Sequence, residues 1–161
     1  MPTLPQAPEY VLARQLIGYL SADPLIAGMM LSDPYDTADQ AQHIQAAARM
    51  ADAVIVVTPQ DIDAAWLDVA TGLMQPRLVV GVLTMAQVGE TTAAERLARI
   101  TAYVVGLLMA WHPEGRGIPY ADPVIEGVTP LNTARYAEFV DMIGVGISVR
   151  HKVRYNALAN L

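Results

Sequence analysis

The side chains that could carry chemistry are few, and two carboxylates form the closest pair. Asp61 and Asp63 are two residues apart, so in an extended segment they share one side of the chain. Paired carboxylates can divide acid and base duties between them, with a histidine as a third group. A solvated loop explains the same two residues without any reaction. A small enzyme therefore stays open as an alternative, although we expect no enzymatic activity.

No other residues have the spacing of a known catalytic, metal or cofactor site. The histidines His43, His112 and His151 are far apart and lack the spacing of a zinc site. Cysteine is absent, which excludes disulfides, thiolate ligands and cysteine nucleophiles. Gly144 and Gly146 lack the third glycine of a dinucleotide-binding turn and fall inside a predicted strand. We therefore predict no catalytic, metal-binding or cofactor-binding residues, and no cofactor.

Arg150, Lys152 and Arg154 form a basic stripe near the end of the chain. Their spacing places all three on one side of a β-strand. The chain has 16 acidic residues, all before position 142, so this stripe stands apart from an acidic body. It either protects an exposed strand edge from aggregation or faces DNA or an acidic partner. The net charge of −6 argues against a generally basic nucleic-acid-binding protein.

Three segments have the periodicity of helices. Residues 8–22 carry a leucine at every fourth position from Leu12, which places these leucines on one face. Residues 92–111 begin with a capping box and continue as an amphipathic stripe. Residues 38–51 have an alanine-rich face that favours a third, smaller helix. Two main helices are therefore expected to position the rest of the fold.

Short apolar and β-branched runs predict the strands. The run at 53–57 and the run at 77–85 are joined by an irregular acidic segment, 59–76, which we expect to be a long hairpin loop. The closing strand alternates apolar residues with small or basic ones, and His151 falls on its apolar side as a core, edge or interface residue. Further strands are expected at 25–31, at 123–131 and, for the closing strand, at about 140–155.

This order of elements predicts an α+β fold. We expect a mostly antiparallel sheet of about four strands, two main helices packed on one face, and the long hairpin loop. A single domain is expected over residues 1–161, with residues 1–8 as a flexible arm and 156–161 as a tail. No segment has the length of a transmembrane helix or the pattern of a signal peptide, so we expect a cytoplasmic protein without membrane contact.

The composition suggests a chain that does not stay alone. Hydrophobic residues make up 53% of the sequence and charged residues only 16%. An average soluble domain carries about 25% charged residues. The shortage of charge predicts that another subunit covers part of the surface.

Several features occur in an order that resembles a known family. An apolar helix ends in Leu107-Leu108-Met109-Ala110-Trp111-His112-Pro113, and a loop rich in glycine and proline follows it at 114–120. A short strand with a glycine at 125–128 and the long closing strand come next, and the strand–loop–strand unit of 53–85 lies upstream. Over residues 9–156 this order resembles the tail terminator proteins of tailed bacteriophages, also called minor tail or tail-completion proteins.

The resemblance implies a virion structural protein that assembles into a homo-oligomer, a hexameric ring. Such a ring caps the completed tail tube, stops its polymerisation and joins it to the head-side connector protein. DNA passes through the lumen without sequence-specific binding. The family has no catalytic residues, and its members are assembled in the host cytoplasm and lie at the head-proximal end of the tail. Another head–tail connector or neck protein is the alternative.

These implications assign roles to two groups of residues. The basic stripe is expected to face the lumen or a partner. Four residues of the acidic segment are expected to contact a neighbouring subunit or the tail tube protein: Asp61, Asp63, Trp66 and Asp68.

Overall fold

The computed structural model describes residues 8–33, 41–66, 71–86, 92–113, 123–133, 141–151 and 153–156. In chain order its elements are α1 (Pro8–Ser21), the short 3-10 helix η1 (Ala27–Met29), α2 (Ala41–Met50), β1 (Val54–Trp66), β2 (Thr71–Met85), α3 (Thr92–Met109), β3 (Val124–Pro130), β4 (Met142–Arg150) and β5 (Val153–Asn156). The strand order is β1-β2-β4-β3, with β5 also beside β2, and all pairs are antiparallel. The predicted α+β class is confirmed, and the sheet is four strands wide as expected.

Two helices, α1 and α3, cover one face of the sheet, as predicted. The leucines of α1 and the apolar stripe of α3 share one core with alternate residues of β1, β2 and β4. The two helices also touch each other, because the Tyr19 hydroxyl donates to the Leu107 carbonyl at 3.0 Å. The Tyr19 ring stacks on Trp111 with centroids 6.3 Å apart. The main core therefore lies between this helix pair and the sheet.

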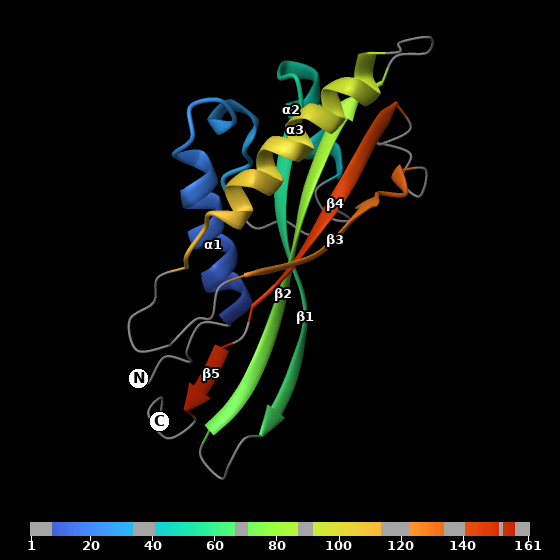
Figure 1. Ribbon diagram of the computed structural model, residues 1–161. Coiled ribbons are helices and arrows are strands. Elements are labelled where there is room, and N and C mark those ends of the chain that lie inside the picture. Colours follow the sequence, from blue (N-terminus) through green and yellow to red (C-terminus); the bar gives the residue numbers. More distant parts are fainter. Residues whose placement is uncertain are drawn as a thin grey trace.

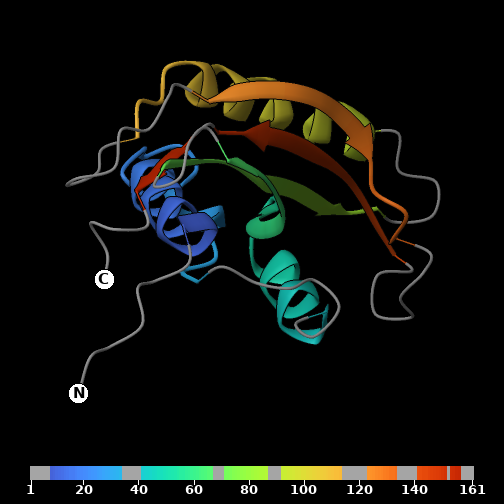
Figure 2. The ribbon, with the colours of Figure 1, turned by 90° about the horizontal axis from the view of Figure 1, so that it is seen from below.

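The third helix, α2, packs on the opposite face. Its buried residues Ala41, Ile44 and Ala48 form a second, smaller core with the other set of alternate strand residues. Figure 2 shows α3 and α2 on opposite sides of a strongly twisted sheet. Within the described residues, the small apolar face of α2 packs at one end of the sheet, near Val54 and Leu83.

The apolar run at 25–31, predicted as a strand, is instead a turn that contains η1. The N–H of Ala27 donates to the Asp23 carbonyl at 2.9 Å, so the backbone groups are satisfied locally. Among the described residues its one bridge to a strand is a parallel contact between Met30 and Ile55. The strand prediction was wrong because hydrophobicity alone does not separate a tight turn from a short strand.

The hairpin of β1 and β2 is much longer than predicted, and these strands occupy most of the expected 59–76 loop. The prediction ended the first strand at Pro59, because proline cannot donate a ladder hydrogen bond. β1, however, is an edge strand. The Ile55 carbonyl accepts the N–H of Leu31 on the outer side at 3.1 Å. Along a strand the backbone groups of every second residue point to the same side, so those of Val57 and Pro59 also point outward. The missing N–H of Pro59 therefore lies on the outer side of β1, where no hydrogen bond to β2 is formed.

A register shift between Pro59 and Ile62 marks the start of the distal hairpin. Such a bulge adds a local kink and extra twist. Beyond it, β1 and β2 extend past the helices towards the bottom of Figure 1, and β5 lies beside β2 there. This three-stranded part, residues 62–66, 71–76 and 153–156, is called the ribbon below.

Glycines on the α2 side of the sheet accommodate Leu131, which follows β3. A Cβ added at Gly146 would meet the Leu131 side chain at 3.1 Å, and one added at Gly81 would meet it at 3.7 Å. A Cβ at Gly144 would lie only 3.0 Å from the Val82 carbonyl. Small residues therefore let the chain after β3 fold back closely over the sheet.

Candidate functional site

The ribbon brings together the acidic and basic segments that the sequence singled out. Asp63 of β1 pairs with Gln75 of β2, and Arg154 of β5 pairs with Leu73 of β2. β2 therefore runs between the two segments, with neighbouring strands about 4.8 Å apart. Trp66 belongs to the same ribbon, and Asp61 lies at the bulge where the ribbon begins. Two predicted contact residues, Asp68 and Lys152, lie outside the described residues.

The closing strand is divided between β4 and β5, but its register is continuous. Arg150 pairs with Arg77, and Val153 pairs with Met74. Across the break the closing strand therefore advances by three residues while β2 also advances by three. The backbone N–H of His151 donates to a β2 carbonyl, that of Pro76, at 3.0 Å. The two strands therefore continue along one line beside β2.

Arg150 is engaged within the chain. Its Nε lies 3.1 Å from Glu126 Oε1, and its Nη1 donates to Gln75 Oε1 at 3.3 Å. The Nε of Arg77 lies 3.3 Å from the other oxygen of the same Glu126. All three charged side chains are partly exposed, and such ion pairs contribute about 0–1 kcal/mol each. Glu126 compensates one of the two arginine charges, so the three side chains together have a formal charge of +1.

Sequence reasoning missed Arg77 and Glu126. They are 49 positions apart in the sequence. They meet because the fold places their strands, β2 and β3, on either side of β4. A bulge between Ile125 and Gly127 sets the local register of β3 at Glu126. Neither the strand order nor this bulge has a signal in the sequence, so the cluster could not be predicted.

His151 is fully buried, which settles its environment as the core and not the edge. Its ring contacts Trp111 edge to face, with centroids 5.1 Å apart and planes at 78°. Neither ring nitrogen has a hydrogen-bond partner among the described residues. Burial without a polar partner disfavours the charged ring and lowers the pKa of His151 from 6.5 to about 4. The ring is neutral at pH 7 and acts as part of the apolar core.

A second polar arrangement joins α3 to the start of the hairpin. The Nε of Arg96 donates to Thr84 Oγ1 at 3.1 Å, and its Nη2 donates to the Met85 carbonyl at 3.1 Å. The hydroxyl of the buried Thr84 donates in turn to the Asp52 carbonyl at 2.7 Å. This chain of hydrogen bonds fixes the N-terminal part of α3 to β2 and to the turn before β1.

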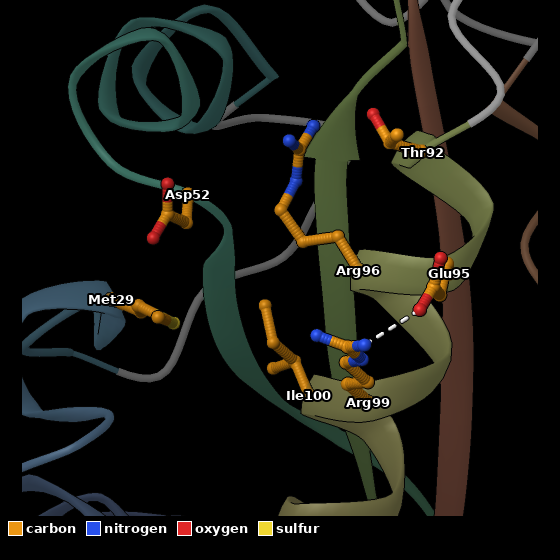
Figure 3. A pocket seen from close by; sticks show the side chains of 7 residues that line it. All are labelled: Met29, Asp52, Thr92, Glu95, Arg96, Arg99 and Ile100. Carbon is orange, nitrogen blue, oxygen red and sulfur yellow. Dashed lines mark hydrogen bonds and ion pairs between the residues drawn. The ribbon is translucent and has the colours of Figure 1, made fainter.

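A cavity of about 390 Å³ lies beside Arg96. Figure 3 shows its lining side chains: Arg96 and Ile100 of α3 extend towards the side of Asp52 and Met29, and Arg99 is paired with Glu95 at 2.7 Å. The lining holds two carboxylates and two guanidinium groups. This balance of charge favours neither an anion nor a cation, so the cavity provides no specific chemistry.

Within the described ranges no group of three or more histidine, aspartate or glutamate side chains is placed to hold a metal ion. His43 and His112 are exposed, and His151 is buried, so the structure does not bring the three histidines into one environment. No helix in the described part of the chain is long and apolar enough to cross a membrane.

Comparison with protein-family models finds no match to this chain, and comparison with curated protein sequences finds none either.

Proposed function

We propose that this chain is a ring-forming virion structural protein, a tail terminator. In this role it caps the completed phage tail tube, stops its polymerisation and joins it to the head-side connector. The proposal starts from the resemblance in the order of sequence features. It is supported by the α+β fold, in which a helix pair covers one face of an antiparallel sheet.

The observation that carries the proposal is the ribbon. Figure 1 shows it extending beyond the helices that cover the rest of the sheet. An isolated two-stranded hairpin is at best marginally stable in water, and three strands need a hydrophobic face or a helix packed against them. A neighbouring subunit or the tail tube would supply that packing. The ribbon contains two of the four residues assigned to such a contact, Asp63 and Trp66.

The charges of the ribbon suit a contact between copies. β1 contributes acidic residues to one side of β2, and β5 contributes Arg154 to the other. Opposite charges on different sides of one protomer favour head-to-tail assembly, the arrangement that produces rings. The basic residues near β5 would face either the lumen or such a partner.

Mass measurement and imaging test the proposal. Light scattering after size exclusion should give a mass several times 17.3 kDa, and negative-stain images should show rings with a central hole. When added to polymerising tail tube protein of the same phage, the chain should shorten the tubes and remain at one end. A protein that stays monomeric at high concentration and also in the tube mixture contradicts the proposal.

A further inference from the structure

We infer that β3 of one copy pairs with β1 of the next, so that the sheet continues from subunit to subunit around the ring. The inference rests on the proposed function and adds the interface to it. Its partner is a second copy of this chain, recognised through backbone hydrogen bonds between two strand edges.

The strand directions fit this pairing. The order β1-β2-β4-β3 contains three antiparallel steps, so the two outer strands run in opposite directions. When a second copy continues the sheet in the same orientation, its β1 therefore runs antiparallel to β3 of the first. Such a head-to-tail contact uses two different surfaces and can be repeated until a ring closes.

The edge of β3 is only partly protected against pairing. Among the described residues β3 pairs only with β4. Val124 and Val128 are 49% and 46% exposed. The one charged residue of β3, Glu126, is held by the arginines of the inner strands. Of the usual protections of an edge strand, β3 has a terminal proline, Pro130, and the bulge at Glu126, but it has no lysine and carries two exposed valines.

The β1 edge offers a segment of matching length. Near its start the outer side of β1 is occupied by the bridge from Met30 to Ile55. Pro59 then removes one outward N–H. Residues 60–66 follow, and these seven residues equal the seven of β3.

Charge favours pairing between the two different edges. The β1 segment contains Asp61 and Asp63, whereas Glu126 together with its two arginine partners has a formal charge of +1. A symmetric contact of two β1 edges would bring four carboxylates together, which like-charge repulsion opposes. At the contact between β1 and β3 the one carboxylate of β3, Glu126, is instead compensated by Arg150 and Arg77 of the two inner strands.

Cysteine scanning tests the inference, because the chain has no cysteine of its own. Val128→Cys is combined with one cysteine at a time at positions 60 to 66, and the assembled protein is oxidised. Strand pairing predicts a ladder of covalent multimers at alternate positions, since only every second residue shares the face of Val128. Each single variant serves as its control and should give no ladder beyond dimers.

Thermal melts first establish that each variant folds, and Val124→Cys replaces Val128→Cys where the latter does not. Assembly is measured on the same samples by light scattering. Oligomers without crosslinks, or with equal crosslinking at all seven positions, overturn the strand pairing and leave the ring in place. A sample that contains only monomers contradicts the proposed function and the pairing together.

Discussion

At the scale of single residues, His151 combines full burial with a ring that has no hydrogen-bond partner among the described residues. Its pKa of about 4 in the folded chain is below the 6.5 of an exposed histidine. Between these two values the unfolded chain binds more protons than the folded one, so acid favours unfolding. The contribution of a neutral His151 is complete above about pH 6.5 and is lost as the pH falls towards 4.

We therefore predict that, through this residue, acidification from pH 7 to pH 4 lowers the free energy of unfolding by up to roughly 3 kcal/mol. His151→Phe keeps an aromatic ring against Trp111 and removes the titration, so its loss over that range should be smaller. Urea unfolding of both proteins at several pH values measures the difference. Equal losses in the two proteins would show that His151 does not control the acid response.

Arg96 and Arg99 provide a matched pair one turn apart on α3. Arg96 donates to a buried hydroxyl and a backbone carbonyl, whereas Arg99 forms an exposed pair with Glu95. We predict that Arg96→Met lowers the free energy of unfolding by about 1–3 kcal/mol. Arg99→Met should cost about 0.5 kcal/mol or less. Denaturant melts compare the two variants, and a similar cost for both would mean that the contacts of Arg96 to β2 add no stability.

At the scale of elements, the sequence was sufficient where one periodic pattern covers a whole element. The leucine spacing of α1, the capping box of α3 and the alternation of β4 predicted these elements correctly. The distal hairpin was missed because Pro59 reads as a strand end until the strand is known to lie at the sheet edge. The ribbon was missed for a related reason, since it depends on the register of three strands along β2.

The glycines test how closely the elements pack. We predict that Gly144→Ala lowers the free energy of unfolding by about 1–3 kcal/mol, since its Cβ would press on the backbone of β2. Gly18→Ala is the contrasting case, because no atom lies within 4 Å of a Cβ at that exposed position of α1. It should raise the free energy of unfolding by about 0.5–1 kcal/mol. Thermal melts that show the opposite order would contradict this account of the packing.

At the scale of the whole molecule, the charges of the basic stripe divide into two kinds. Arg150 is bound to Glu126 and Gln75, so reversing its charge would disturb contacts within the chain. A test of partner contact should therefore keep Arg150 and change the other two residues of the stripe.

We predict that Lys152→Glu together with Arg154→Glu leaves the melting temperature within a few degrees but blocks tail completion. The physical reason is that charge reversal repels an acidic partner or DNA while leaving the Arg150 contacts in place. The yield of infectious particles from a phage carrying both changes measures the effect, with the conservative pair Lys152→Arg and Arg154→Lys as control. An unchanged yield would exclude an essential contact through these two residues.

The position of β2 also has a mechanical consequence. Among the described strands β2 pairs with β1, β4 and β5, and its 15 residues span about 50 Å. A pull on the ribbon along this strand would load the ladders to β1 and to the β4–β5 line in shear, with many hydrogen bonds sharing the force. A sideways pull would instead peel these bonds apart one after another. The protein should therefore resist tension along β2 far better than tension across it.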